Sequence, residues 1–241
     1  MKKLVVLALA VVVALACHAQ NIVYDNNAEV RAVEKFTGIE ASGTIAVYLS
    51  QGNEQGVAVS AGEKKYNAKI KTEVKNGVLI ISVDGGLWNG FSWTSKKLKA
   101  YVTVTDLSRI ELSGASFISI AGAIKAPDLR LEVSGASELK GIVNVNRLNI
   151  DASGASVVRL SGTVSEARIE ASGACKISSY GLSIDNCNAQ ATGASDIRAT
   201  VNKQLNAEAS GGSTIYYKGA GVATVNASTG SKVQNRSGDD D

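Results

Sequence analysis

The sequence predicts an all-β protein: a single-stranded right-handed parallel β-helix with coils of about 18–21 residues, and N-terminal antiparallel hairpins in the same domain. Three observations predict this fold. A Ser-Gly-Ala-Ser motif recurs along the chain, its flanks alternate apolar and polar residues, and helical periodicity is absent. One such unit cannot bury its own apolar face, whereas stacked units share a continuous core.

The motif returns at intervals of 21, 19, 19, 20, 18 and 18 residues, which is the spacing of a repeat array. A β-propeller blade needs about 40 residues, roughly twice this period, so one solenoid coil per unit fits best. The copies are Ser113-Gly114-Ala115-Ser116, Ser134-Gly135-Ala136-Ser137, Ser153-Gly154-Ala155-Ser156, Ser172-Gly173-Ala174-Cys175, Thr192-Gly193-Ala194-Ser195, Ser210-Gly211-Gly212-Ser213 and Ser228-Thr229-Gly230-Ser231.

The alternation in the flanks shows which side chains share a face. Residues 129–133 alternate apolar and charged side chains, which is the pattern of a half-buried strand. By the same parity the last residue of each motif points inward, so we expect a buried, hydrogen-bonded serine ladder in which Cys175 replaces one serine. Cys187 also has inward parity. Two arrangements remain open for these cysteines: a disulfide, which an exported protein permits, or two separate thiols.

The first third of the chain lacks the regular period but still predicts strands. Residues 45–49 alternate, and Asn76-Gly77 separates two apolar runs, which is a strong hairpin signal. The predicted organisation is a signal peptide over 1–19, a linker over 20–30, an N-terminal coil and hairpin or cap region over 31–105, the repeat β-helix over 106–234 and a disordered tail over 235–241.

The N-terminus predicts export. Lys2 and Lys3 precede an apolar run over residues 4–16, the pattern of a secretory signal. Cleavage after Ala19 is one reading, and lipidation of Cys17, as in a lipoprotein, is the alternative. We therefore expect a location in the periplasm or at the cell surface. No later apolar run is long enough to span a bilayer, so we expect no transmembrane segment in the mature chain.

Charge and histidine content exclude several classes of function. The formal net charge is +3 without a basic block, so we expect no nucleic-acid partner. The one histidine, His18, lies in or beside the signal. The mature chain therefore lacks the histidine of a catalytic triad or of a histidine-ligated zinc site. We predict no cofactor and no enzymatic activity.

Acidic residues two positions before the motif form a first candidate site. In stacked coils they would make an outward column with neighbours ~4.8 Å apart, and arginines two residues earlier would offset their repulsion. The simplest interpretation is a solvated, ion-paired face. The alternatives are calcium or another cationic ligand, or contact with a partner. The column consists of Glu111, Glu132, Asp151, Glu170 and Glu208.

A second candidate site is aromatic. Trp88, Phe91 and Trp93 fall together in the glycine-flanked segment 86–93 of a chain that has few aromatic residues. These rings would either cover an open end of the β-helix or form an exposed platform for sugar rings or a partner protein.

The N-terminal motifs Phe36-Thr37-Gly38-Ile39-Glu40, Gln51-Gly52-Asn53-Glu54 and Asn76-Gly77-Val78-Leu79-Ile80, followed by the repeats, resemble the head GIN domain family of exported bacterial proteins. The resemblance spans roughly residues 31–233. It implies a β-helical fold, a Bacteroidetes-like source and the label of an auto-transporter adhesin. It implies no catalytic residues, and position 40 is Glu where the family's name has Asn.

The sequence therefore favours a non-catalytic exported envelope or surface protein, an adhesion or scaffold module whose partner is a cell-surface glycan or an envelope protein. Two other functions stay open: a carbohydrate-binding module and a polysaccharide-active β-helix enzyme, the latter by fold analogy alone. Such an enzyme would need carboxylates in a groove walled by long loops, which the repeat does not offer. The oligomeric state does not follow from the sequence.

Overall fold

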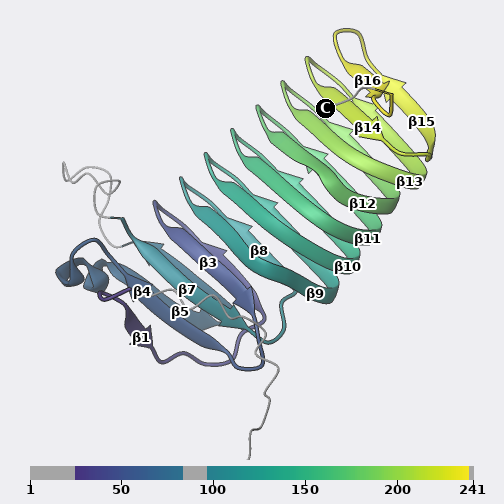
Figure 1. Cartoon of the computed structure of the whole chain (residues 1–241). Coiled ribbons are helices and arrows are strands. Elements are labelled where there is room, and N and C mark those ends of the chain that lie inside the picture. Colours follow the sequence, from purple (N-terminus) through teal and green to yellow (C-terminus); the bar gives the residue numbers. More distant parts are fainter. Residues whose placement is uncertain (1–24, 84–96, 239–241) are drawn as a thin grey trace, which may run out of the picture.

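The computed structural model describes residues 25–83 and 97–238. It is a β-solenoid of about seven turns whose parallel coils stack along one axis, with antiparallel strands at the N-terminal end (Figure 1). The predicted all-β parallel β-helix with N-terminal antiparallel strands is thus confirmed. The predicted signal, with Cys17, lies outside the described residues.

In the repeat array one bent strand runs from each motif to the next. Neighbouring strands are parallel and in register, so that Glu138 lies between Phe117 and Val157. Three shorter strands, β14, β15 and β16, complete the array at its C-terminal end. The strands are β9 (Phe117–Val133), β10 (Glu138–Ala152), β11 (Val157–Ala171), β12 (Lys176–Ala191), β13 (Asp196–Ala209), β14 (Thr214–Lys218), β15 (Val222–Ala227) and β16 (Lys232–Asn235).

The motif forms the corner between coils, and its backbone is part of the stacking. The Ala136 N–H donates to the Gly114 carbonyl at 2.7 Å, and equivalent bonds join the other corners. The last residue of the motif turns inward, as predicted. Ser116 is 2% exposed, and its hydroxyl donates to the Ser113 carbonyl at 2.9 Å. A serine therefore satisfies a corner carbonyl that has left the strand ladder.

The cysteines follow the same logic. Cys175 occupies the serine column, with its Sγ 3.2 Å from the Ser156 hydroxyl and 3.2 Å from the Ser172 carbonyl. Cys187 lies later in β12, in register with Ala167 and Leu205. Both are buried free thiols. The disulfide that the sequence left open is not formed, because inward parity alone does not bring two side chains of one coil together.

At the N-terminal end the order of the coils along the solenoid axis differs from their order in the sequence. The coil that comes first in the sequence, β2 and β3, is the second coil of the stack. Strands β6 and β7 lie beneath β2 and β3, and all pairs are parallel. Strands β2 and β3 in turn lie beneath β8 and β9. The bounds are β2 (Gly38–Ala41), β3 (Ala46–Gln51), β6 (Val78–Val83), β7 (Lys99–Val104) and β8 (Arg109–Leu112).

Antiparallel strands close this end. Strand β5 (Ile70–Lys75) pairs with β6 through the Asn76-Gly77 turn, whose φ angles are 52° and 75°, which confirms the predicted hairpin. Strand β4 (Gly56–Ser60) pairs with β7, β1 (Glu29–Arg31) pairs with β4, and a 3-10 helix (Lys64–Lys69) joins β4 to β5. Strand β1 begins inside the segment expected to be a linker.

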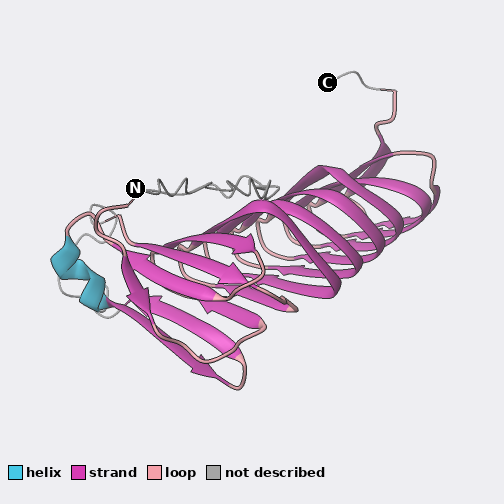
Figure 2. Cartoon of the chain, turned by 60° about the horizontal axis from the view of Figure 1, so that its bottom comes forward, coloured by secondary structure: helices cyan, strands magenta, loops and turns pink. Residues whose placement is uncertain are grey.

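The core is the closed interior of the solenoid (Figure 2). Inward side chains stack from coil to coil, as in the fully buried column Leu131, Ile150 and Ile169. Each large aliphatic side chain buried in this way contributes roughly 1.5–3 kcal/mol. Within residues 25–83 and 97–238 no helix has the length and apolar character needed to span a bilayer.

Candidate binding surface

Two strand faces of the solenoid point outward and meet at the Ser-Gly-Ala corner. We call the outward side chains of β2, β8, β15 and the second halves of β9 to β13 the acidic face. We call the outward side chains of β3, β7, β14, β16 and the first halves of β9 to β13 the aromatic face. Each face is a parallel sheet, and each presents one side chain per coil in every column.

The acidic column lies where the sequence placed it. Glu132 is in register with Glu111 on one side and with Asp151 on the other, and Asp151 with Glu170. The column continues through Gln190, an amide, to Glu208. It also extends one coil further than predicted, because Glu40 of β2 lies beside Glu111.

Arginines pair with three carboxylates of this column, Glu111, Glu132 and Glu170. Arg109 Nη2 lies 2.6 Å from a Glu111 oxygen and 3.2 Å from a Glu132 oxygen. Arg130 Nε lies 2.7 Å from Glu132, and Arg168 pairs with Glu170. These pairs are partly exposed, and such pairs contribute roughly 0–1 kcal/mol each. Their effect is to remove the repulsion between stacked carboxylates.

The arrangement does not favour a bound cation. Asp151 has Asn149 as its neighbour two residues earlier, and it lies in a shallow hollow lined by Arg130, Arg168 and Glu170. The guanidinium groups there would repel calcium. No group of three or more His, Cys, Asp or Glu side chains in the described part of the chain is placed to hold a metal ion. Cation binding by this column stays a prediction that the described geometry does not support.

The second predicted site lies outside the described residues. Trp88, Phe91 and Trp93 belong to segment 84–96, which connects β6 to β7.

The aromatic face carries chemistry that sequence reasoning missed. Of the eight aromatic side chains in the described residues, five project outward from this one face. The ring of Tyr48 on β3 stacks on that of Tyr101 on β7, with centroids 5.4 Å apart and planes at 22°. Phe117 follows on β9 and has the Lys140 ammonium 5.1 Å from its ring centroid. Tyr180 and Tyr216 lie at the C-terminal end of the face.

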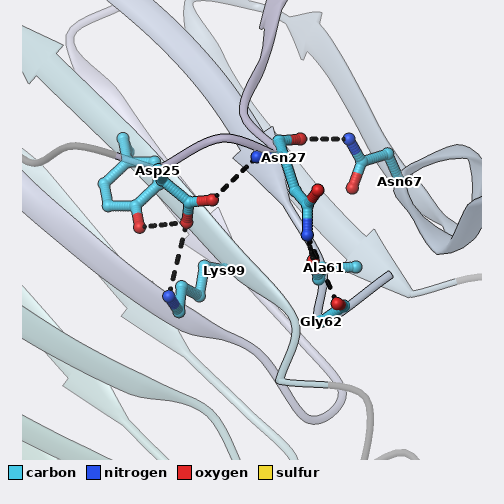
Figure 3. Close-up of polar contacts among 7 residues, drawn as sticks. Asp25, Asn27, Ala61, Gly62, Asn67 and Lys99 are labelled. Atoms are coloured by element: carbon cyan, nitrogen blue, oxygen red, sulfur yellow. Dashed lines mark hydrogen bonds and ion pairs between the residues drawn. The ribbon is translucent and has the colours of Figure 1, made fainter. Parts of the chain in front are cut away.

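The Tyr101 ring is held at its hydroxyl end by Asp25, whose carboxylate also contacts Lys99 (Figure 3). Its O–H donates to Asp25 Oδ2 at 2.8 Å, and Lys99 Nζ lies 3.3 Å from the same oxygen. The hydrogen bond from Tyr101 lowers the pKa of Asp25 to about 2, since it stabilises the carboxylate. Burial and the same bond raise the pKa of Tyr101.

The Asp25 carboxylate is fixed by the segment that carries it. Asp25 Oδ1 accepts the Asn27 N–H at 3.1 Å, and Asn27 Nδ2 donates to the Ala61 carbonyl at 3.0 Å. Asn67 Nδ2 donates to the Asn27 carbonyl at 2.7 Å. Residues 25–28 are therefore fastened to the turn after β4 and to the 3-10 helix, and Asp25 orients one ring of the aromatic face.

One signal in the sequence could have found this face. The positions one and three residues after each motif have outward parity, and they include Phe117 and Tyr216. Tyr48 and Tyr101 lie outside the regular array, so their alignment with these positions depends on pairing between distant strands.

Comparison with known proteins assigns the chain to a family. A family model described as "Putative auto-transporter adhesin, head GIN domain" matches residues 35–221. No curated protein sequence matches the chain significantly.

Three solved structures share the fold. A "putative adhesin" from Bacteroides fragilis is 22% identical with a TM-score of 0.78, and the match covers 86% of this chain and 95% of that one. A "putative adhesin" from Parabacteroides merdae is 17% identical with a TM-score of 0.67 (86% and 95%). A "Putative lipid binding protein" from Parabacteroides distasonis is 17% identical with a TM-score of 0.64 (88% and 97%). Because the family model spans most of the chain, this solenoid belongs to the head GIN domain family that the model describes.

Proposed function

We propose that this chain is an exported, non-catalytic adhesion module that binds cell-surface glycans through its aromatic face. The observation that carries the proposal is the gathering of five outward aromatic side chains on one sheet face. Aromatic rings exposed on a rigid surface present apolar faces that can stack on sugar rings, while polar neighbours bond to sugar hydroxyls.

The Tyr48, Tyr101 and Phe117 group is the best-formed part of this face, and we call it the aromatic platform. Tyr48 is 38% exposed, so its ring is accessible. Hydrogen bonding to Asp25 and stacking on Tyr48 both restrain Tyr101. A ring that is already ordered loses little conformational entropy on binding, and more of the contact energy appears as affinity.

A non-catalytic role fits the acidic face. Its carboxylates are stacked in one column, and Glu111, Glu132 and Glu170 are paired with arginines. Glycoside hydrolysis instead needs two carboxyl groups that face a sugar from opposite sides. The polysaccharide-active alternative therefore has no support from the described carboxylates. Export rests on the predicted signal over residues 1–19, and we propose the cell surface rather than the periplasm because an adhesion module must meet its ligand outside the cell.

A glycan array followed by calorimetry on the best ligand tests this function. The double variant Tyr48→Ala, Phe117→Ala should weaken binding by about tenfold or more, since each stacked ring contributes roughly 0.5–1.5 kcal/mol beyond its area. Ile142→Ala is the matched control, because Ile142 is 43% exposed and lies off the aromatic platform. Absence of any glycan ligand, or equal affinity of both variants, would contradict the proposal. Fractionation with surface proteolysis tests the location.

A further inference from the structure

The C-terminal end of the solenoid has two strands with an open edge. Strand β15 pairs with β13 and β16 pairs with β14, each on one side only among the strands that the structure describes. Figure 1 shows these two strands in the last coil of the stack. The open side of such a strand presents backbone N–H and C=O groups that can pair with another chain.

The hydrophobic core is open at the same end. Ala207 is fully buried, whereas Val225, which lies next to it in the same inward column, is 48% exposed. Ile215 is buried, and Val233 beside it is only partly buried. Each earlier coil of the array is covered by the coil that follows it. The last coil therefore exposes apolar side chains that a further coil would cover.

The N-terminal end is closed to the same kind of contact. Its outermost strands are β1, which has three residues and carries Glu29 and Arg31, and β5, which carries the exposed pair Glu73 and Lys75. Short or charged edge strands resist pairing with another chain. A head-to-tail fibre, in which the C-terminal end of one copy meets the N-terminal end of the next, is therefore disfavoured.

The last coil lacks the charges of the coils before it. The acidic column ends with Glu208, because the next coil has Asn226 at the same position. Residues 222–231 contain no charged side chain, and β15 and β16 together carry Lys232 alone. When two identical surfaces meet, like charges are brought together and repel. A nearly neutral end removes this obstacle to contact with a second copy.

The corner at residues 228–231 gives the last coil a geometry that can pair with itself. Strand β15 runs toward this corner and β16 runs away from it. A two-fold axis through the corner, perpendicular to the solenoid axis, therefore places β15 of each copy antiparallel to β16 of the other. The two pairings, four residues each, would form about eight backbone hydrogen bonds, which lies within the roughly 10 ± 5 of a typical interface.

Other occupants fit this end less well. An extended peptide would pair with one of the two edges and leave the second edge and the open core uncovered. A helix would pair with neither edge, because its backbone groups bond within the helix. The end of a second solenoid covers both edges and brings Val225 and Val233 of each copy against apolar side chains.

We propose that two copies of this chain associate end to end through β15 and β16, as an isologous dimer. Association stops at two copies because the N-terminal ends are capped. The dimer does not depend on the glycan-binding function proposed above. If that function holds, the dimer presents two aromatic platforms at its far ends, and binding to both sites raises the overall affinity for a surface.

The first test measures the mass and shape of the chain in solution, with the predicted signal over 1–19 removed. Sedimentation equilibrium should show a dimer, and small-angle X-ray scattering should give nearly twice the maximum dimension of the monomer. Val225→Lys should weaken association by about tenfold or more, because it buries a charge in the interface. Ile142→Lys is the matched control, since Ile142 is 43% exposed in the middle of the array; it should leave the dimer intact.

A second variant tests the two-fold axis without changing the core. Thr229 is exposed at the corner, so in the proposed dimer it lies near Thr229 of the other copy. Thr229→Cys should therefore give a covalent dimer with a short bismaleimide, whereas the buried Cys175 and Cys187 should react little. Ala155→Cys, at an exposed corner in the middle of the array, should not cross-link.

Several outcomes would overturn the proposal. They are a monomer at all concentrations, assemblies that grow beyond two copies, a dimer no longer than the monomer, and equal weakening by Val225→Lys and Ile142→Lys. Failure of Thr229→Cys to cross-link would exclude the two-fold axis at this corner. A dimer that binds no glycan would refute the proposed function and support this inference, and a glycan-binding monomer would do the reverse.

Discussion

The corner glycines allow the stacking argument to be tested with a single methyl group. Gly135 has a φ of +72°, and a Cβ built on it would lie 2.4 Å from the Gly114 carbonyl oxygen and 3.0 Å from the Gly114 nitrogen. The neighbouring corner bonds are short, with the Ala136 N–H donating to Gly114 at 2.7 Å and the Ala155 N–H to Gly135 at 2.8 Å. Gly135→Ala therefore places a methyl group between two rungs that are in backbone contact.

Two costs add at this position. A left-handed backbone costs an alanine roughly 1–2 kcal/mol. The contact with Gly114 involves backbone atoms, so no rotamer change relieves it, and the rungs must separate. Weakening the two corner hydrogen bonds costs about 1 kcal/mol each. We expect Gly135→Ala to lower the free energy of unfolding by about 3–4 kcal/mol, against a typical total of roughly 5–15 kcal/mol.

Two matched glycines separate these costs. Gly122 has a φ of +76° with nothing within 4 Å of its built Cβ, so Gly122→Ala should lose only about 1–2 kcal/mol. Gly56 has neither the positive φ nor a near neighbour, so Gly56→Ala should be neutral or slightly stabilising. Urea unfolding followed by far-ultraviolet circular dichroism measures all three. If Gly135→Ala loses no more than Gly122→Ala, the rungs do not limit each other at the corner and the reasoning fails.

Two further predictions concern the N-terminal fastening and the serine column. The pKa of Asp25 is about 2 in the folded chain against an ordinary 3.8, so its carboxylate stabilises the fold above pH ~4 and this contribution disappears as pH falls through ~2. Asp25→Asn should lower the free energy of unfolding by about 1–2 kcal/mol at pH 6 and by almost nothing near pH 2. Urea unfolding at both pH values measures this difference. An equal loss at both pH values would exclude a role for the charge. Cys175→Ser should change stability by less than about 0.5 kcal/mol, because the hydroxyl can donate to the Ser172 carbonyl as the other serines of the column do to theirs; a loss above about 2 kcal/mol in thermal unfolding would show that the column does not accept serine at this coil.

The period of the sequence was sufficient to predict the array because stacking converts sequence spacing into register. Once one coil fixes which residues face inward, every later coil repeats it, and Ser137, Ser156 and Cys175 fall into a single buried column. The Asn76-Gly77 hairpin was predictable for a local reason, since only a few residue pairs tolerate two successive positive φ angles.

The N-terminal end was not predictable in the same way. Its coil order follows from pairing between strands that are far apart in the chain, with β7 beneath β3 and β6 beneath β2. No period relates these segments, so the sequence offers no register for them. For that reason the stacking of Tyr48 on Tyr101, the placement of Glu40 beside Glu111 and the bond from Tyr101 to Asp25 became visible only in the structure.

The stacking of coils explains the outward residues of the acidic face better than those of the aromatic face. On the acidic face, Arg109, Arg130 and Arg168 recur two residues before Glu111, Glu132 and Glu170, and each pair neutralises itself. These three carboxylates are balanced within their own coils, so no ligand is needed to account for them. On the aromatic face, stacking would be satisfied by Thr, Ser or Lys at the outward positions, and several coils carry those residues. Rings appear instead at the two ends of the face. Tyr101 lies beside the Asp25 carboxylate, and the Tyr216 ring has Arg198 5.7 Å and Arg236 4.6 Å from its centroid. Because the fold does not require these rings, we expect the proposed glycan partner to contact them, first at Tyr48 and Tyr101.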